Sequence, residues 1–225
     1  MIQFLFFDVD DTILDFAWSE NHAIRRTYRE LGVELTEEMY ARYHTVNRQF
    51  WEQYERGDIT REELLLARHH WMSEKYGLHL DPAECERRYR VNLGDGYHFM
   101  PHAMEILEWL KPRCRLFLAT NGVAATQYSR LTSAGILPYF ENVFISEEIG
   151  AYKPMPEYFD YCFSHIPGFR REEAAIVGDS ISSDILGGQQ AGIQTIWMNP
   201  EKKPGRPDIR PDYEIRDLIE LKTIL

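Results

Sequence analysis

Three aspartates follow a short apolar run at the start of the chain. Residues 2–7 are almost wholly apolar, which is typical of a strand buried on both faces of a parallel sheet, and Asp8, Asp10 and Asp11 come next. Because side chains alternate along an extended chain, Asp8 and Asp10 can project from the same side. Two neighbouring carboxylates repel each other unless a proton or a cation lies between them, so the pair favours a Mg²⁺ site. The alternative is an ordinary strand that ends in a solvated acidic turn.

Further polar groups stand at the ends of later apolar runs and in one loop. They are Thr120 and Asn121 after one run, Lys153 in a loop, and Asp179 with Asp184 after another run. Taken singly, each has an ordinary explanation: a helix cap, a solvated lysine or a plain turn. In open α/β sheets, however, ligands bind outside the carboxyl ends of the strands. The order of these groups therefore predicts a single site that combines carboxylates with a lysine.

Two kinds of segment must position these groups. From residue 100 onward helices alternate with strands, which together with residues 1–15 predicts an α/β core with a doubly wound parallel sheet and right-handed crossovers. Residues 16–99 instead show four consecutive helical patterns without a strand, which predicts an inserted α-helical bundle. Thr60 and Glu63 form a capping-box pattern that opens the third of these helices.

The second predicted helix of the insert carries a stripe of aromatic residues around a single amide. The stripe includes Trp51 and Tyr54, with Asn47 one turn before Trp51. Such a stripe forms bundle core more often than a surface for a ligand. Asn47 fits a core less well, because a buried amide needs hydrogen-bond partners. Both interpretations remain open at this point.

Composition excludes several classes of partner. The chain has 225 residues, is 44% hydrophobic and 27% charged, and carries a formal net charge of −11. This charge argues against a nucleic-acid polymer or an anionic membrane as partner, and no apolar run is long enough to cross a bilayer. Three cysteines without zinc-binding spacing, and no signal peptide, favour reduced thiols and a cytoplasmic location. We expect a monomer or a weak homodimer.

The four polar groups, in this order, resemble the four motifs of the haloacid dehalogenase (HAD) superfamily. The matching stretches are Asp8-Val-Asp-Asp-Thr12, Thr120-Asn-Gly122, Lys153-Pro154 and Gly178-Asp-Ser-x-x-x-Asp184. The resemblance covers the whole chain if residues 16–99 are the type-1 cap that such proteins carry after the first motif. The stretches 41–51 and 183–192 further resemble the pyrimidine 5′-nucleotidase subfamily.

The resemblance implies a role for each of these residues. Asp8 is implied to attack phosphorus, and Asp10 to act as general acid and then general base. A Mg²⁺ ion is implied to bind Asp8, the backbone carbonyl of Asp10, and Asp179. The remaining core groups are implied to hold the phosphoryl oxygens (Thr120, Asn121), to neutralise charge (Lys153) and to orient Lys153 or a metal-bound water (Asp184). On the cap, Asn47, Trp51 and Tyr54 are implied to contact the rest of the substrate.

These roles predict a Mg²⁺-dependent phosphomonoesterase for a small phosphate ester, with pyrimidine nucleoside 5′-monophosphates as the expected substrates. A sugar or acyl-sugar phosphatase is the main alternative, and a phosphomutase would keep every motif found here. Dehalogenase and phosphonate hydrolase chemistry are disfavoured, because neither uses an aspartate at the position of Asp10. A protein retained for binding alone is disfavoured as well, because no motif residue is missing.

Overall fold

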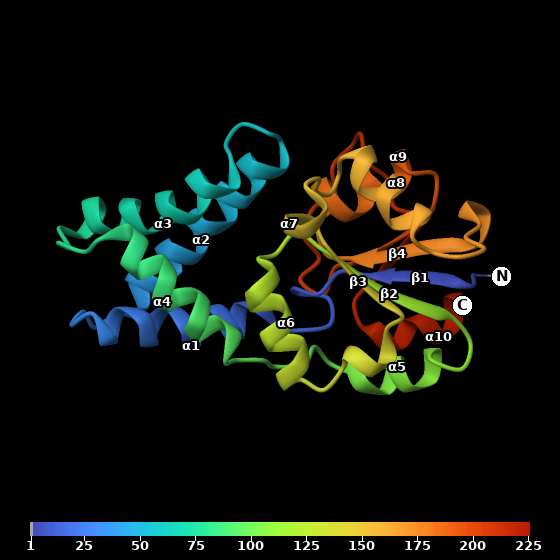
Figure 1. Ribbon diagram of the computed structural model, residues 1–225, viewed down its shortest axis with the longest axis horizontal. Helices are drawn as coiled ribbons and strands as arrows, with labels where there is room; N and C mark the ends of the chain where they lie inside the picture. The colour runs from blue at the N-terminus through green and yellow to red at the C-terminus, as the bar shows by residue number, and fades with distance from the viewer. Residues whose placement is uncertain (1) are drawn as a thin grey trace.

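The computed structural model describes residues 2–225, which form two lobes joined by two short connections (Figure 1). One lobe contains a six-stranded sheet in the order β3-β2-β1-β4-β5-β6, in which each neighbouring pair is parallel. The strands are β1 (Phe4–Phe7), β2 (Arg115–Thr120), β3 (Asn142–Ile145), β4 (Ala174–Gly178), β5 (Gln194–Met198) and β6 (Tyr213–Ile215). The predicted doubly wound parallel sheet is thus confirmed.

Helices cover both faces of this sheet and give it two buried cores. On one face, α5 and α10 pack against the side chains that β1, β2 and β4 project towards them, and together they form a large, mostly aliphatic cluster. On the other face, α8 and α9 cover a second cluster that is rich in phenylalanine. The helices of this lobe are α5 (Ala103–Leu110), α6 (Ala124–Ser133), α7 (Ser146–Ile149), α8 (Pro156–Ser164), α9 (Leu186–Gln190) and α10 (Leu221–Ile224), with short helical turns at 137–139, 171–173, 181–185 and 218–220.

The second lobe consists of four helices inserted after β1, and we call it the cap. They are α1 (Phe16–Glu30), α2 (Glu37–Glu55), α3 (Arg61–Tyr76) and α4 (Pro82–Gly94). Thr60 and Glu63 form the predicted capping box at the start of α3, and Gly77 ends that helix in the left-handed conformation. Where the cap ends and the core begins, at residues 15/16 and 99/100, stays a prediction.

The two connections between the lobes run side by side. The backbone N–H of Asp15 donates to the carbonyl of His98 at 2.8 Å, and the N–H of Met100 donates to the carbonyl of Ile13 at 2.9 Å. Asp15 also caps α1 by accepting from the N–H of Trp18, so it is a structural residue. This paired crossing fixes the place about which the cap can turn relative to the core.

Strand direction decides where a site can form. Strand β1 begins at the side of the core opposite the cap and runs towards the cap, so the carboxyl ends of the parallel strands face the cap (Figure 1). In this sheet the strand order reverses between β1 and β4, because β2 and β3 lie on one side of β1 and the later strands on the other. Asp8 follows β1 and Asp179 follows β4, so the two aspartates flank the switch point at which such sheets bind ligands.

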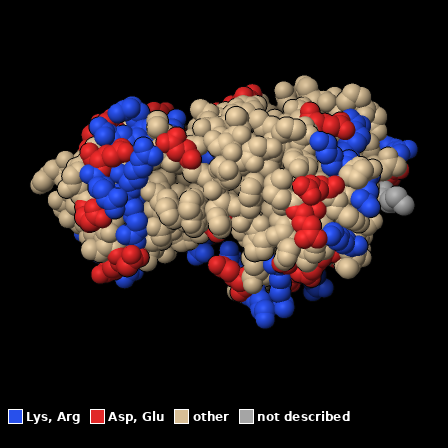
Figure 2. Space-filling view, turned by 90° about the horizontal axis from the view of Figure 1, so that it is seen from below, with Lys and Arg blue, Asp and Glu red and all other residues tan. Residues whose placement is uncertain are grey.

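Charged side chains of both signs are intermingled on the surface of the cap. On the face shown in Figure 2, basic and acidic side chains lie next to each other on the cap. Ion pairs within the cap, such as Arg26–Glu30 on α1 and Arg88–Glu84 on α4, follow the same mixed arrangement. Within residues 2–225, no helix is both long enough and apolar enough to pass through a membrane.

Candidate active site

A buried lysine joins two of the predicted aspartates. Lys153 Nζ donates to Asp8 Oδ1, to Asp184 Oδ1 and to the carbonyl oxygen of Ala119, each at 2.6 Å. All three hydrogens of the ammonium group are therefore used, and its side chain is 1% exposed. Burial alone would lower the pKa of Lys153, but the two carboxylates outweigh burial and raise it, so the lysine stays charged.

A close backbone approach brings Asp184 to this position. The turn at Ile181–Ile185 is a wide π-helical turn, and the N–H of Ser180 donates to Asp184 Oδ2 at 3.1 Å. A Cβ added to Gly178 would lie 2.2 Å from the carboxylate of Asp184. Glycine is thus needed at the end of β4 because the Asp184 side chain occupies the space that any other side chain would take. Single π-turns of this kind often occur at functional sites.

The carboxylates of Asp8, Asp179 and Asp184 form an acidic cluster that could hold a cation. One oxygen from each lies within 4.8 Å of the other two. Burial is the main cause that raises the pKa of Asp8 to about 8, although Lys153 opposes it, and burial together with neighbouring carboxylates raises the pKa of Asp179 well above its usual range. Both shifts reflect carboxylates that are withdrawn from water and lie close to other carboxylates. Oxygen ligands and this excess of charge fit a hard divalent cation such as Mg²⁺.

The cluster overlaps with the predicted ligand set without matching it fully. Asp8 and Asp179 are in both sets, and Asp10 was expected to contribute its backbone carbonyl, not its carboxylate. Asp184 is the additional member, but both of its oxygens already accept hydrogen bonds, from Lys153 and from Ser180. This arrangement suits its predicted role of orienting Lys153.

Asn121 holds the backbone of Lys153. Its Nδ2 donates to the carbonyl of Lys153, and its Oδ1 accepts from the N–H of Lys153, both at 2.9 Å. Thr120 Oγ1 accepts from the N–H of Gly122 at 3.1 Å and from Gln127 Nε2 at 3.0 Å. With both lone pairs used, the hydroxyl of Thr120 keeps its own proton for donation to a ligand oxygen.

Asp10 lies apart from the lysine, in contact with helix α6. Gln127 Nε2 donates to Asp10 Oδ2 at 2.7 Å, and Arg130 Nη1 forms an ion pair with Asp10 Oδ1. The side chain of Asp10 is 29% exposed, whereas that of Arg130 is only 1% exposed. The side chain of Asp10 is therefore partly accessible between the lobes, while Gln127 and Arg130 bind its two oxygens from the side of the core.

A small cavity of about 40 Å³ lies in front of Asp10, between core and cap. The cap lines it with Phe16, Trp51 and Leu65, and with the buried arginine Arg68. A drug-sized ligand needs a pocket of roughly 300–1,000 Å³, so the lobes are closed too tightly here to admit a nucleotide. Trp51 and Asp10 line the same cavity, from the cap and from the core, and a contact of Trp51 with substrate stays a prediction.

Asn47 lies within the cap and does not line this cavity. Its Nδ2 donates to Glu20 Oε1 at 2.6 Å, and its Oδ1 accepts from Arg68 Nη1 at 3.0 Å. Arg68 also pairs with Glu86 at 2.6 Å. The buried amide thus has the hydrogen-bond partners that it needs, and these partners could not be identified from the sequence. Asn47 is connected to the cavity through Arg68, which lines it.

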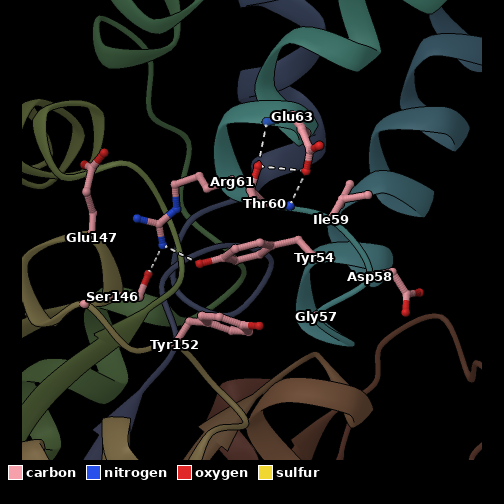
Figure 3. Close-up of a pocket in the computed structure, with 11 residues that line it drawn as sticks. Tyr54, Gly57, Asp58, Ile59, Thr60, Arg61, Glu63, Ser146, Glu147 and Tyr152 are labelled. Atoms are coloured by element: carbon pink, nitrogen blue, oxygen red, sulfur yellow. Dashed lines mark hydrogen bonds between the residues drawn. The ribbon is translucent and has the colours of Figure 1, made fainter.

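Tyr54 lies in a different part of the lobe interface, on a cavity of about 470 Å³ (Figure 3). Its ring packs against Tyr152 of the core with centroids 4.4 Å apart, and its hydroxyl accepts from Arg61 Nη2 at 2.9 Å. The same Arg61 nitrogen reaches the core, where it bonds to Ser146 Oγ and lies 3.5 Å from the carbonyl of Asn121. Tyr54 and Arg61 thus join cap to core beside the site.

A cap carboxylate also reaches the core. Ser182 Oγ, from the turn that carries Asp184, donates to Glu55 Oε2 at 2.6 Å. Burial is the main cause that raises the pKa of Glu55 to about 7. Together with the Arg61 contacts, this hydrogen bond links the end of α2 to the core.

The sequence interpretation missed several charged or polar residues of the site: Glu55, Arg61, Arg68, Gln127 and Arg130. Gln127 and Arg130 could have been found, because they are three residues apart on the helix that follows the Thr120-Asn121-Gly122 stretch. Residues at that spacing share a helix face. Arg68 could not have been distinguished from the many arginines of the cap.

Comparison with known proteins places this geometry in a family. Residues 2–192 match the haloacid dehalogenase-like hydrolases. The crystal structure of YfnB from Bacillus subtilis, which is bound to magnesium and is described as showing interdomain movement, superposes with a TM-score of 0.96 at 44% identity, covering 100% of this chain and 98% of that one.

Two further relatives carry an assigned activity. The pyrimidine 5′-nucleotidase PynA from Streptococcus pneumoniae is 34% identical over 97% of this chain and 94% of its own length. The pyrimidine 5′-nucleotidase YjjG from Escherichia coli is 30% identical over 98% of this chain and 96% of its own length. With the family match spanning most of the sequence and these relatives spanning nearly all of it, the chain belongs to the haloacid dehalogenase-like hydrolases.

Proposed function

We propose that this hydrolase is a Mg²⁺-dependent phosphomonoesterase that acts on pyrimidine nucleoside 5′-monophosphates through an aspartyl-phosphate on Asp8. The observation that carries the proposal is the buried ion pair of Asp8 with Lys153 at the switch point of the sheet, two residues along the chain from Asp10, which lines a cavity together with Trp51. The core side of this site can bind a phosphoryl group, and the cap side provides an aromatic surface.

The core residues divide the proposed chemistry between them. Lys153 binds one oxygen of Asp8 and leaves Oδ2, which takes no hydrogen bond from residues 2–225, to attack phosphorus. Asp10 must enter the reaction protonated; it gives this proton to the departing alkoxide and afterwards takes a proton from the water that hydrolyses the aspartyl-phosphate. The hydroxyl of Thr120 and the charge of Lys153 stabilise the phosphoryl oxygens as charge develops on them.

A Mg²⁺ ion held by Asp8, Asp179 and the backbone carbonyl of Asp10 would supply further positive charge to a phosphoryl oxygen. A site rich in carboxylates needs this, because a phosphate ester brings its own negative charge.

The cap supports a pyrimidine as the other half of the substrate. Trp51 and Phe16 line the cavity with aromatic surface, on which a planar base could stack for roughly 1–3 kcal/mol. Arg68 lines it too, but its side chain is only 3% exposed and its guanidinium donates to Asn47 and Glu86, so it shapes the cavity from behind the aromatic surface. PynA and YjjG, similar over nearly their whole length, support the same substrate class.

A panel of phosphate esters tests this proposal directly. Purified protein with Mg²⁺ should release phosphate from UMP, dUMP or dTMP with a higher kcat/KM than from purine nucleotides, hexose phosphates or acyl-sugar phosphates. Trp51→Ala should reduce this preference more than it slows p-nitrophenyl phosphate, which is too small to need the cap. If a sugar or acyl-sugar phosphate is the best substrate, the nucleotidase assignment is wrong; isomer formation in place of free phosphate would indicate a phosphomutase.

A further inference from the structure

Helix α6 carries two polar side chains that both bind the carboxylate of Asp10. Gln127 and Arg130 lie three residues apart on one face of the helix, and each donates to a different oxygen of the Asp10 carboxylate. We infer that Gln127 and Arg130 are positioning residues, which together hold the carboxyl group of Asp10 in the orientation that reaches the leaving group of the substrate. This inference rests on the proposed phosphatase function and assigns residues to it outside the four motifs.

The hydrogen bonds of Gln127 allow only one orientation of its amide. Its Nε2 donates to Asp10 Oδ2 at 2.7 Å and to Thr120 Oγ1 at 3.0 Å, while its Oε1 accepts from Arg130 Nη1 at 3.2 Å. Both N–H hydrogens and the carbonyl are thus in use. A flipped amide would set its oxygen against the Asp10 carboxylate and its N–H groups against the guanidinium. The amide therefore ties the acid–base candidate to the phosphate-binding threonine.

The backbone of Gly122 lies so close to the Gln127 side chain that a larger residue at position 122 would collide with it. A Cβ added to Gly122 would lie 2.4 Å from Gln127 Nε2 and 2.8 Å from its Cγ. Glycine at this position of the second motif is therefore required by a side chain from α6, five residues further along. This second observation, independent of the hydrogen bonds, shows that the motif and the helix face are built to fit each other.

Arg130 serves Asp10 and not the fold. Two of its nitrogens, Nε and Nη2, are buried without a hydrogen-bond partner among residues 2–225. Desolvating an arginine for one carboxylate and one amide oxygen is costly, and such buried pairs are weak contributors to stability. Phe16, the first residue of α1, covers the guanidinium with its ring centroid 5.8 Å away. An arrangement this costly is best explained by what it does to Asp10.

Direct contact between Arg130 and the substrate is the alternative, and burial argues against it. Arg130 also lines the cavity, but its side chain is only 1% exposed, whereas that of Asp10 is 29% exposed. A substrate in the cavity would meet the Asp10 carboxyl before it met the guanidinium. Arg130 consequently acts through Asp10.

Leaving-group dependence provides the test. The alkoxide of UMP needs a proton as it departs, whereas the dinitrophenolate of 2,4-dinitrophenyl phosphate departs without one, and kcat/KM reports this first step for both esters. Arg130→Met should lower kcat/KM for UMP ~10²-fold, as misplacing a catalytic group does, and lower it far less for the dinitrophenyl ester. Arg130→Lys, which keeps a charge that can reach Asp10, should recover part of the loss, and Gln127→Leu should show the same bias towards the activated ester.

A double variant separates positioning from a purely structural role. In an Asp10→Asn background, Arg130→Met should cause no further loss with UMP, because there is no longer a carboxyl group to position. Tyr128→Phe, which removes a hydroxyl contact with Glu148 on the exposed side of the same helix, is the matched control and should leave both esters unaffected.

Three outcomes would overturn the inference: equal losses on both esters, further loss in the Asp10→Asn background, or no loss at all in folded Arg130→Met and Gln127→Leu. Failure of the proposed function gives a different result, because wild-type protein would then prefer another phosphate ester to UMP. In that case the preferred ester replaces UMP in the comparison with 2,4-dinitrophenyl phosphate. The positioning role of Gln127 and Arg130 is then tested independently of the proposed substrate.

Discussion

At the scale of single residues, the site depends on charges that have been removed from water. Lys153 is surrounded by oxygens and stays protonated, so it cannot act as a base and serves as a fixed positive charge between Asp8 and Asp184. A fixed charge of this kind is preorganised and needs no rearrangement when the phosphoryl group arrives. The nucleophile is therefore oriented before substrate binds.

The first prediction concerns that nucleophile. Asp8→Asn should abolish phosphate release, because an amide cannot form the acyl phosphate, and Asp10→Asn should lower turnover by ~10²–10⁴-fold, as loss of a general acid–base does. Steady-state assays of both variants, with circular dichroism to confirm folding, check this. Near-normal turnover by a folded Asp8→Asn protein would show that another group attacks.

The second prediction concerns the cation. Asp179→Asn removes a carboxylate from the acidic cluster, so the Mg²⁺ concentration for half-maximal activity should rise by at least roughly 10-fold, the lower end of what changes around metal ligands produce. EDTA should silence the wild type, and Mg²⁺ should restore it better than Ca²⁺, which prefers larger and looser coordination. Calorimetric titration of Mg²⁺ into both proteins gives a readout that does not need turnover. Full activity after exhaustive chelation would contradict a metal requirement.

At the scale of the element, short turns at strand ends determine where these charges lie. The π-helical turn after β4 returns Asp184 to the backbone of Gly178. We expect Gly178→Ala to displace Asp184 and so to remove one of the two carboxylates that hold Lys153, with a loss of activity of ~10²-fold, the effect of misplacing a catalytic group by about 1 Å. The control is Gly205→Ala, whose added Cβ would meet only Trp197 and Ile181, at 3.8 and 3.9 Å. If both glycine variants keep wild-type activity in the same assay, the close approach at Gly178 does not matter.

Inside the cap, a buried ion pair makes stability depend on pH. Burial would raise the pKa of Glu86, but Arg68 and His69 outweigh it and lower the pKa to about 2. A depressed carboxylate pKa contributes stability above the unfolded value of about 4.5, and the contribution is lost as pH falls towards 2. Glu86→Gln leaves Arg68 without its counter-charge and should cost roughly 3 kcal/mol at pH 7.

Urea unfolding at several pH values checks this prediction. The difference in unfolding free energy between wild type and Glu86→Gln should be constant from pH 7 to pH 5 and should shrink below about pH 4.5, where the wild-type carboxylate begins to be protonated on unfolding. Glu84→Gln, whose carboxylate pairs with arginines on the cap surface, is the control and should cost little at any pH. A difference that does not vary with pH would show that Glu86 contributes by packing alone.

The sequence predicted elements better than it predicted contacts. Strands, helices and the inserted bundle follow from apolar periodicity and capping residues, which are local properties, and the structure reproduces them. The four motif stretches could be read from the chain because each lies at the end of an element. The partners of Asn47 and Asp10 come instead from 21 to 120 positions away, namely Glu20, Arg68 and Arg130. Such pairings depend on tertiary packing, which periodicity does not report.

At the scale of the whole molecule, the two lobes must separate for substrate to enter. The cavity beside Asp10 holds about 40 Å³, little more than the share of one water molecule in the liquid, roughly 30 Å³. Closure nevertheless benefits catalysis, because it removes water from charges that then interact more strongly. The paired connections at Asp15–His98 and Ile13–Met100 are the place about which opening can occur, and YfnB, at 44% identity, is described as showing interdomain movement.

The last prediction concerns the contacts that hold the closed state. Arg61 reaches from the cap to Ser146 and towards the carbonyl of Asn121, beside the packing of Tyr54 on Tyr152 (Figure 3). Arg61→Met keeps the length of the side chain and removes these polar contacts, so the equilibrium should shift towards open molecules. A ligand stabilises closure only through contacts made in the closed state, so the variant should need more substrate to close and should show a higher KM with UMP.

Small-angle X-ray scattering of the free proteins measures the shift directly. The radius of gyration of Arg61→Met should exceed that of wild type, and orthovanadate with Mg²⁺, as a mimic of the transferring phosphoryl group, should reduce the difference. Arg29→Met removes an exposed ion pair with Glu34 within the cap and is the matched control, with no expected effect on size or KM. If Arg61→Met scatters like wild type with an unchanged KM, closure is held elsewhere, and the hydrogen bond of Ser182 to Glu55 becomes the contact that must carry it.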